Sequence, residues 1–322
     1  MSDAGPWRVL ALPPLPHDVL VSLFADERIE LVTPAQRTPE HVAELMPTAD
    51  IVIGDWSPSL RLDDPGPRVC FVQQPSVGVD GIDTEAFAAA GVPVANCHGA
   101  NTVSVAEWCL SATLALLRHT VEADAAVRRG EWPQTSVGGR ELSGRRVGVV
   151  GMGPIGRAVA ERFTALGCVV SYWSRTPKPE APAPWLELDE LLASSEIVIL
   201  VVALAAQTRG LLDARRLALL PQGGLLLNGA RAEVVDEAAL LAALDSGHLG
   251  GVALDVFSTE PLAADSPLRA APRVLLSPHV AGATGEAAMR IVGQSSANLR
   301  RALDGEPVID VVNGVDPLVR RR

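Results

Sequence analysis

A glycine-rich segment, Gly-Met-Gly-Pro-Ile-Gly at 151–156, has the residue types and spacing of a loop that binds a dinucleotide. An apolar stretch, 146–150, precedes it, and an amphipathic stretch, 155–166, follows it. In such a strand–loop–helix the glycines permit a tight turn, close approach of a pyrophosphate and close packing of the helix on the strand. The helix N-terminus directs free N–H groups and the positive end of its dipole to the phosphates. The predicted dinucleotide-binding residues are Gly151, Gly153, Pro154, Ile155 and Gly156.

The next apolar stretch, 169–173, ends in residues that bear on the choice between NAD and NADP. In NAD-binding proteins an acidic residue about 20 positions after the glycines holds the ribose hydroxyls. Here the stretch is followed by Ser174, Arg175 and Thr176, without Asp or Glu. The two hydroxyls can donate to a phosphate, and the guanidinium can pair with one. We therefore expect NADP(H) as the favoured cofactor and NAD(H) as the alternative.

Apolar runs recur through the middle of the chain at intervals that fit one short strand and one crossover helix each. The runs are apolar at consecutive positions, as expected of strands that are covered on both faces. This alternation predicts a doubly wound parallel sheet. The intervening amphipathic stretches are 155–166, 189–193, 210–220 and 236–244. The expected strands are 147–150, 169–173, 197–202, 225–227, 251–254 and 274–276.

The first hundred residues show a looser form of the same alternation, which predicts a second, smaller α/β domain. A long amphipathic stretch without a helix breaker, 102–119, predicts a helix that connects the two domains, and the Pro- and Ala-rich stretch 176–184 predicts an exposed loop. The expected strands of the smaller domain are 8–12, 30–32, 51–53, 69–73 and 92–95, and its expected helices include 16–26 and 84–90.

Further motifs follow one another along the chain. They are Val-Gly-Val-Asp at 77–80, Asn-Thr-Val-Ser-Val-Ala-Glu at 101–107, Asn-Gly-Ala-Arg at 228–231, Ala-Leu-Asp-Val-Phe-Ser-Thr-Glu-Pro-Leu at 253–262 and Ser-Pro-His-Val-Ala-Gly-Ala-Thr at 277–284. In content and order this set resembles the D-isomer-specific 2-hydroxyacid dehydrogenase family, and its glyoxylate/hydroxypyruvate reductase-like members in particular. The resemblance extends from about residue 69 to residue 313.

The resemblance implies an α/β fold with two Rossmann-like domains. A doubly wound, parallel-sheet NAD(P)-binding domain at 101–282 is expected to be inserted in a smaller flavodoxin-like substrate-binding domain at 1–100, which 283–322 completes. The implied reaction is hydride transfer between NAD(P)H and a small 2-oxo acid, or the reverse oxidation of a D-2-hydroxy acid. Family members are usually dimers, so we expect a homodimer.

Three residues match the catalytic positions of the family, and each follows a predicted strand of the nucleotide-binding domain. The guanidinium of Arg231 can bind the carboxylate and the carbonyl oxygen of a 2-oxo acid together. His279 is the natural acid–base for the carbonyl oxygen. Glu260 is expected to hydrogen-bond the other ring nitrogen of His279, which sets the tautomer and favours the protonated imidazole.

The resemblance also implies substrate and cofactor contacts elsewhere. Val77 and Gly78 match a loop whose backbone amides bind the substrate carboxylate, a role that suits glycine because the ligand approaches the backbone closely. Thr102 matches a position near the cofactor, and it could cap the helix that follows instead of, or in addition to, that role. Asp255 matches the position that contacts the nicotinamide carboxamide. The full set of expected cofactor contacts outside the segments already given is Thr102, Gly229, Ala230, Arg231, Asp255, His279 and Gly282.

Composition limits the classes of partner. The 322 residues are 48% hydrophobic and carry a formal net charge of −11, which disfavours nucleic acid and anionic membranes as partners. The beginning of the chain has no basic segment followed by an apolar core, and the longest apolar run, 197–206, is too short to span a membrane. Four cysteines without a CxxC spacing predict reduced thiols, and the scattered histidines predict no metal site. We expect a cytoplasmic protein.

The sequence leaves other functions open. Phosphite and formate dehydrogenases share the scaffold, although Glu260 argues against the formate type because oxidation of formate needs no proton transfer. A non-catalytic NAD(P)-sensing dimer, resembling the C-terminal-binding corepressors, is an alternative from another class. Within the 2-hydroxyacid class, phosphoglycerate, hydroxypyruvate, glyoxylate and branched 2-oxo acids all remain candidates, because loops such as 54–57 are expected to select among them.

Overall fold

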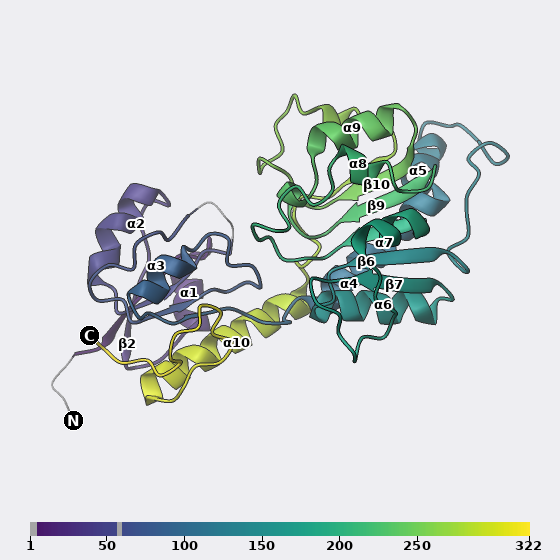
Figure 1. Ribbon diagram of the computed structural model, residues 1–322. Helices are drawn as coiled ribbons and strands as arrows, with labels where there is room; N and C mark the ends of the chain where they lie inside the picture. The colour runs from purple at the N-terminus through teal and green to yellow at the C-terminus, as the bar shows by residue number, and fades with distance from the viewer. Residues whose placement is uncertain (1–4, 57–59) are drawn as a thin grey trace. The chain divides into compact units, whose positions relative to one another are not determined.

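The computed structural model describes residues 5–56 and 60–322 of the chain. The chain forms two compact units, which we call the first unit (1–100 with 285–322) and the second unit (101–284) (Figure 1). Each unit contains one sheet whose strands all pair in parallel, with helices against it. The predicted α/β fold class is therefore confirmed. Of the loop predicted to select the substrate, Ser57 lies outside the described residues, as does the beginning of the chain at 1–4.

The first unit has the strand order β2-β1-β3-β4-β5, which is the flavodoxin-like order of a doubly wound sheet. Its strands are β1 (Trp7–Ala11), β2 (Ile29–Val32), β3 (Ile51–Ile53), β4 (Phe71–Gln73) and β5 (Val94–Ala95). Its helices are α1 (His17–Leu23), α2 (Pro39–Leu45), α3 (Thr84–Ala89) and α10 (Gly285–Asp304), with a 3-10 turn, η1 (Met46–Thr48), after α2.

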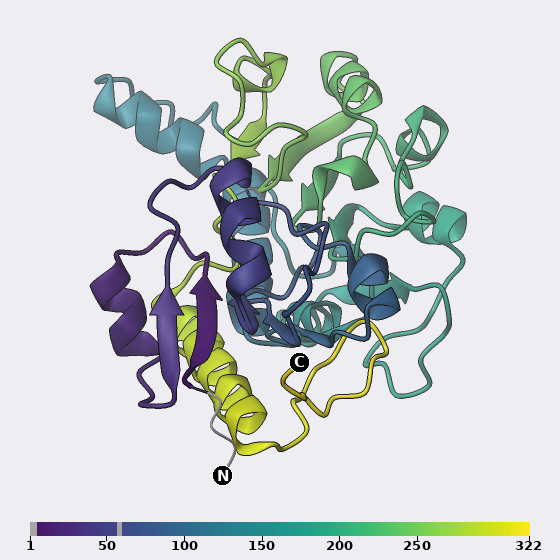
Figure 2. The same ribbon diagram turned by 90° about the vertical axis from the view of Figure 1, so that its left-hand side faces the viewer.

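Alternate residues of each strand in the first unit enter two different hydrophobic clusters, because successive side chains of a strand point to opposite faces. Val9 of β1 packs in a cluster with residues of α1 and α10, whereas Leu10 packs in a cluster with residues of α2 and α3. In Figure 2, α10, in yellow, runs beside the purple strands of this unit. The sheet is thus covered on both faces.

The second unit has the strand order β11-β10-β9-β8-β6-β7. An isolated parallel bridge between Tyr172 and Trp185 extends the sheet beyond β7 and produces the 3-2-1-4-5-6 order of dinucleotide-binding sheets, followed by one further strand. The strands are β6 (Arg146–Val150), β7 (Val169–Trp173), β8 (Ile197–Leu200), β9 (Gly224–Asn228), β10 (Leu249–Leu254) and β11 (Val274–Leu276). The helices are α4 (Thr102–Arg118), α5 (Thr120–Arg128), α6 (Pro154–Ala165), α7 (Leu188–Ser194), α8 (Ala214–Leu217) and α9 (Glu237–Asp245), and the 3-10 turns are η2 (Ala232–Val234) and η3 (Pro267–Arg269).

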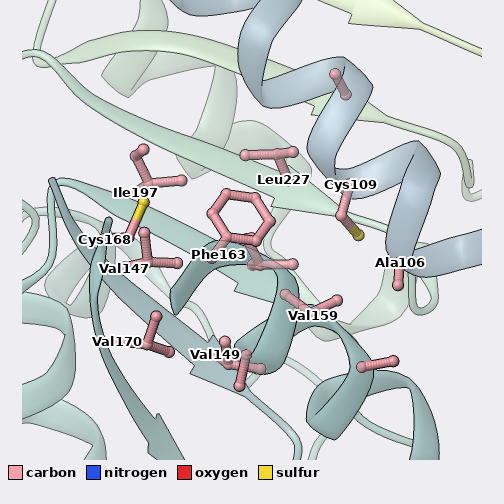
Figure 3. Close-up of a cluster of buried hydrophobic side chains, with 14 of the residues drawn as sticks. Ala106, Cys109, Val147, Val149, Val159, Phe163, Cys168, Val170, Ile197 and Leu227 are labelled. Carbon is pink, nitrogen blue, oxygen red and sulfur yellow. The ribbon is translucent and has the colours of Figure 1, made fainter. Parts of the chain in front are cut away.

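Helices cover both faces of the second sheet: α4 and α6 lie on one side, and α7, α8 and α9 on the other (Figure 1). Figure 3 shows the core on the first side, where the fully buried ring of Phe163 points from α6 into a cluster with Cys109 of α4 and with Ile197 and Leu227 of the strands. Burial of one such side chain stabilises the fold by about 1.5–3 kcal/mol. This packing holds α6, and with it the glycine-rich loop, against the sheet.

Two differences from the predicted elements have local causes. The stretch 210–220 contains only the four-residue helix α8, because Leu212 forms a bridge to Val235 and Asp213 then caps the helix by accepting from Arg216 N–H at 2.8 Å. The long helix α10 was not predicted. The residues that it buries include alanines, Ser295 and Asn298, so few large apolar side chains mark its buried face in the sequence.

The four cysteines are buried as free thiols. Burial raises the pKa of the Cys97 thiol to about 11 and that of the Cys70 thiol to about 12. Both groups are therefore protonated near neutral pH. Among the residues that the structure describes, no helix is both long enough and apolar enough to cross a membrane.

Candidate nucleotide and acid–base site

The six strands of the second unit end in register. Each terminal residue pairs with that of the next strand, so that one row of residues crosses the whole sheet. Loops at the carboxyl ends of parallel strands are where α/β proteins bind ligands. The next residue of each strand begins a loop at this edge, and these loops carry most of the predicted site. The row, from β7 to β11, is Trp173, Val150, Leu200, Asn228, Leu254 and Leu276.

The glycine-rich loop follows β6 and leads into α6, as predicted. Gly151 has φ +107°, and a Cβ on it would lie 2.8 Å from the backbone carbonyl of Val201. A Cβ on Gly156 would overlap the carbonyl oxygen of Gly151, so this glycine allows the helix to pack on the turn. At Gly153 nothing lies within 4 Å of the Cβ position. The loop thus has two glycines required by the fold and one that leaves room for a diphosphate at the start of a helix.

The segment after β7 forms a tight turn that has no carboxylate. Ser174 Oγ donates to the Thr176 carbonyl at 2.7 Å, and Trp185 Nε1–H donates to the Ser174 carbonyl at 3.0 Å. Arg175 is exposed and forms no ion pair with any residue that the structure describes. Its charge is therefore available to an anion near this end of the sheet.

The loop after β9 is shaped by one buried amide. Asn228 Nδ2 donates to the Arg231 carbonyl at 2.9 Å, and its Oδ1 accepts from Ala230 N–H at 3.0 Å. A Cβ on Gly229 would lie 3.3 Å from Cζ3 of Trp108, so the indole ring borders this turn. The half-buried Arg231 donates from Nη1 to the Ala230 carbonyl at 2.7 Å. The turn places the guanidinium at the same sheet edge as the glycine-rich loop.

The loop after β11 carries His279, which the structure pairs with Glu260. His279 Nδ1 lies 2.8 Å from Glu260 Oε2, as the sequence led us to expect, and Glu260 Oε1 accepts from Phe257 N–H at 3.0 Å. Because a carboxylate only accepts hydrogen bonds, Nδ1 carries the hydrogen in this contact, and the neutral imidazole is the Nδ1–H tautomer. His279 Nε2 has no hydrogen bond to the described residues, and the side chain is 41% exposed. The free nitrogen can exchange a proton with a ligand.

Asp255, which follows β10, is 1% exposed, and its carboxylate accepts three hydrogen bonds. Oδ1 accepts from Ser277 Oγ at 2.6 Å and from Val280 N–H at 2.8 Å, and Oδ2 accepts from Ala281 N–H at 2.7 Å. A carboxylate offers about four acceptor positions. One position therefore remains for the carboxamide contact that the family resemblance implies, which stays a prediction.

Thr102 and Gly282 lie near the start of α4. Thr102 does not cap this helix, because Asn101 occupies the N-cap position and Thr102 Oγ1 is buried without a hydrogen bond. The capping alternative is therefore wrong, and an unsatisfied hydroxyl remains for a ligand. A Cβ on Gly282 would lie 2.7 Å from Asn101 Nδ2, so a side chain there would displace the Asn101 amide.

Val77 and Gly78 belong to the first unit, in a loop whose carbonyls are all directed into hydrogen bonds. The carbonyl of Ser76 accepts from Cys97 N–H at 2.9 Å, that of Val77 from Asn96 Nδ2 at 2.7 Å, and that of Gly78 from Ser76 Oγ at 2.7 Å. The N–H groups of Val77 and Gly78 form no hydrogen bond within the described part of the chain. Successive unpaired amides of this kind suit an anion such as a carboxylate.

Ser277 and Trp108 also take part in the second-unit site, and the sequence analysis did not identify them. Trp108 Nε1–H donates to Ser277 Oγ at 3.0 Å. The position of Ser277, two residues before His279, was the only available signal for it. Nothing in the pattern of α4 distinguishes Trp108 from a core residue. Across 5–56 and 60–322, no group of three or more His, Cys, Asp or Glu side chains could hold a metal ion.

Comparison with known proteins identifies the relatives of this chain. A family profile described as D-isomer specific 2-hydroxyacid dehydrogenase, NAD binding domain, matches residues 110–281. D-3-phosphoglycerate dehydrogenase of Mycobacterium tuberculosis is 39% identical over 251 residues, covering 77% of this chain and 47% of that protein. Glyoxylate reductase of Aeropyrum pernix is 38% identical over 258 residues, covering 77% of each.

A solved structure extends the comparison over nearly the whole chain. The crystal structure of NAD-dependent formate dehydrogenase from Staphylococcus aureus in complex with NAD matches with a TM-score of 0.82 at 27% identity, covering 95% of this chain and 98% of that chain. The chain spans about half the length of the D-3-phosphoglycerate dehydrogenases that it matches. The family profile and the relatives agree with the motifs and the sheet order: this chain belongs to the D-isomer specific 2-hydroxyacid dehydrogenase family.

Proposed function

We propose that this protein transfers a hydride between a nicotinamide cofactor and a small 2-oxo acid or D-2-hydroxy acid. The observation that carries the proposal is the pair Glu260–His279, in which one ring nitrogen is held at 2.8 Å and the other makes no hydrogen bond to the described residues. This pair shares its sheet edge with Arg231 and with the glycine-rich loop at 151–156. Together they supply an acid–base, a cation for an acid substrate and a dinucleotide site.

In the proposed reduction, His279 Nε2–H donates a proton to the carbonyl oxygen as this oxygen becomes an alkoxide. Glu260 keeps the imidazole oriented and stabilises its positive charge before the proton is transferred. Arg231 binds the substrate carboxylate and polarises the carbonyl. When bound, the nicotinamide ring supplies the hydride. Oxidation of the D-2-hydroxy acid follows the same path in reverse, with neutral His279 as the base.

We further propose that the first unit binds the substrate carboxylate through the unpaired N–H groups of Val77 and Gly78. Three internal hydrogen bonds support this assignment, since they hold the neighbouring carbonyls away from an anion. Under this proposal the region 101–282 is the nucleotide-binding domain, and 1–100 with 283–322 is the substrate-binding domain.

For the cofactor we propose NADP(H) in preference to NAD(H). The exposed Arg175 has no ion-pair partner among the described residues, and the turn at 174–176 has no carboxylate that would repel a 2′-phosphate. The proposed contacts beyond this turn are the glycine-rich loop, Thr102, the 229–231 turn, Asp255, His279 and Gly282. We also propose a homodimer in the cytoplasm; light scattering of the purified protein tests the dimer.

Initial rates with glyoxylate, hydroxypyruvate and 2-oxoisocaproate, each with NADPH and with NADH, test the reaction. We expect turnover with at least one acid, and faster turnover with NADPH. Formate and phosphite with NADP⁺ and NAD⁺ serve as matched alternatives, and His279→Ala is the control protein. Turnover only with formate or phosphite would overturn the 2-oxo acid proposal. Dinucleotide binding without any turnover would favour the sensor alternative.

A further inference from the structure

A chain of hydrogen bonds connects α4 to the loop that carries His279. The indole of Trp108 can only donate, so Ser277 Oγ accepts from it at 3.0 Å and directs its own hydrogen to Asp255 Oδ1 at 2.6 Å. The Asp255 carboxylate in turn accepts from the N–H groups of Val280 and Ala281, at 2.8 and 2.7 Å. In each of these hydrogen bonds, the chemistry of the two groups determines which one donates.

These hydrogen bonds surround a residue whose backbone conformation is strained. His279 has φ +56°, a left-handed conformation that is strained for a residue with a side chain. The two amides after it are bound to Asp255, and Ser277 N–H before it donates to the Leu254 carbonyl at 3.0 Å. Hydrogen bonds thus hold the loop both before and after His279, and they keep His279 in the left-handed conformation. Asp255 is the group that holds the residues after it.

The same indole also borders the Arg231 turn. Its Cζ3 would lie 3.3 Å from a Cβ on Gly229, so the ring edge lies against the backbone of that residue. Gly229 begins the turn that Asn228 closes on Arg231. Trp108 is half-buried and lies on a helix that packs against β9 and β10, the two strands that precede the Arg231 turn and Asp255. One side chain therefore contacts two loops that come from different strands.

We propose that Trp108 is a positioning residue that sets the relative placement of the His279 imidazole and the Arg231 guanidinium, acting through Ser277 and Asp255 on one loop and through ring contact with Gly229 on the other. This inference rests on the proposed function for its kinetic consequences. Its structural consequence is that the turn at 277–281 is immobilised, and this can be measured whether or not the enzyme turns over.

The test compares loss of the donor with loss of the acceptor. Trp108→Phe keeps an aromatic ring at this position of α4 and removes the donor to Ser277, whereas Ser277→Ala removes the acceptor and leaves the indole, with its contact to Gly229, in place. Each single variant is expected to lower kcat about tenfold, which corresponds to about 1.4 kcal/mol, because each removes one hydrogen bond that holds the loop of His279. KM and the Kd of NADPH are expected to stay within about twofold, since neither group is assigned to ligand binding.

The double variant decides whether Trp108 acts through Ser277. If it does, Trp108→Phe added to Ser277→Ala lowers kcat little further, because the second change removes a bond already broken. Trp7→Phe, the same substitution at a half-buried tryptophan of the first unit, is the control and is expected to leave kcat unchanged. Unchanged kcat in Trp108→Phe, fully additive losses, or an equal loss of NADPH affinity would each overturn the proposal.

Hydrogen exchange provides a readout that does not depend on activity. In Trp108→Phe the amides of Val280 and Ala281 are expected to exchange faster, while amides of β6 keep their protection. If the wild-type protein turns over none of the acids tested, the proposed reaction is wrong. The exchange rates at 280–281 still test the positioning role of Trp108 in that case. Unchanged exchange at 280–281 overturns the inference even where the enzyme is active.

Discussion

The carboxylate of Glu260 holds His279 with one oxygen and its own loop with the other. Oε2 lies 2.8 Å from His279 Nδ1, and Oε1 accepts from Phe257 N–H at 3.0 Å. Because both oxygens are engaged, the carboxylate does not rotate away from the imidazole at low cost. The ring is thereby held with Nε2 directed away from Glu260, and this one contact also determines which ring nitrogen carries the hydrogen of the neutral imidazole.

Glu260→Gln is expected to slow reduction about 10- to 100-fold, the range typical of losing the hydrogen-bond partner that orients a functional histidine. The amide can still accept a hydrogen bond, but it no longer offers a negative charge that stabilises the imidazolium. Initial rates of reduction with NADPH measure the loss, and Glu260→Asp, which keeps the charge, should retain more of the wild-type rate. A reduction rate in Glu260→Gln equal to that of the wild type would contradict the role.

His279→Ala is expected to reduce kcat about 10²- to 10⁴-fold, because it removes the proton donor of the proposed reaction. Dinucleotide affinity should change much less, since His279 is only one of the proposed cofactor contacts and the phosphates are assigned to the glycine-rich loop. Steady-state rates and NADPH titration by fluorescence measure the two quantities separately. If affinity and turnover fell together, the side chain would be needed for structure or for cofactor binding and not for proton transfer.

Gly153→Ala and Gly156→Ala form a matched pair that separates binding from folding. A methyl group at Gly153 meets nothing within 4 Å, whereas one at Gly156 overlaps the Gly151 carbonyl. Gly153→Ala is expected to leave the Tm of the cofactor-free protein unchanged and to weaken NADPH binding. Gly156→Ala should reduce the free energy of unfolding by about 1–3 kcal/mol, as overpacking does. Thermal unfolding and cofactor titration distinguish the two, and equal effects of both variants would be inconsistent with a diphosphate at Gly153.

Arg175→Ala is expected to raise the KM for NADPH about tenfold and that for NADH less than about twofold, because a charge-assisted contact to a 2′-phosphate exists only with NADPH. Arg215→Ala is a matched control in the same unit, since the Arg215 guanidinium pairs with Asp189 at 2.7 Å. The ratio of kcat/KM values for the two cofactors is the quantity to measure. An equal change with both cofactors would show that Arg175 does not select NADP.

The buried carboxylate of Asp50 supports a prediction on stability and pH. Burial alone would raise the pKa of Asp50, but hydrogen bonds from Arg8 N–H, Arg68 and Arg321 outweigh it and lower this pKa below its ordinary value of 3.8. A lowered native pKa means that the charged form stabilises the fold above the unfolded pKa, and that this contribution is lost as pH falls through the native value.

Arg321→Ala is therefore expected to reduce the free energy of unfolding by about 1–2 kcal/mol near pH 7. The difference from the wild type should narrow as pH falls below 3.8, since a protonated Asp50 no longer attracts Arg321. Urea unfolding at a series of pH values measures both quantities. A difference that stays constant over this pH range would assign the effect to packing, for example to the contact of Arg321 with the Trp7 ring at 5.0 Å.

Part of the fold was predictable from local patterns. The central strands β8 and β9 of the second unit are buried on both faces, so their residues form continuous apolar runs that stand out in the sequence. The glycine-rich loop is equally local, since its turn and its helix contact lie within six residues. Helix α10 was missed because several of the positions that it buries are small or polar, among them Ser295 and Asn298, which hydrogen-bond inside the first unit.

The sequence by itself determined the parallel sheets, the dinucleotide loop and, through the family motifs, the three residues to which chemistry is assigned. Tertiary structure alone decided how those residues are held. The indole of Trp108 meets Ser277 across 169 positions, and Asp255 meets the amides after His279 across 25 and 26. Such contacts leave no periodic trace, because they arise only when parallel strands end in register and bring loops from distant parts of the chain to one edge.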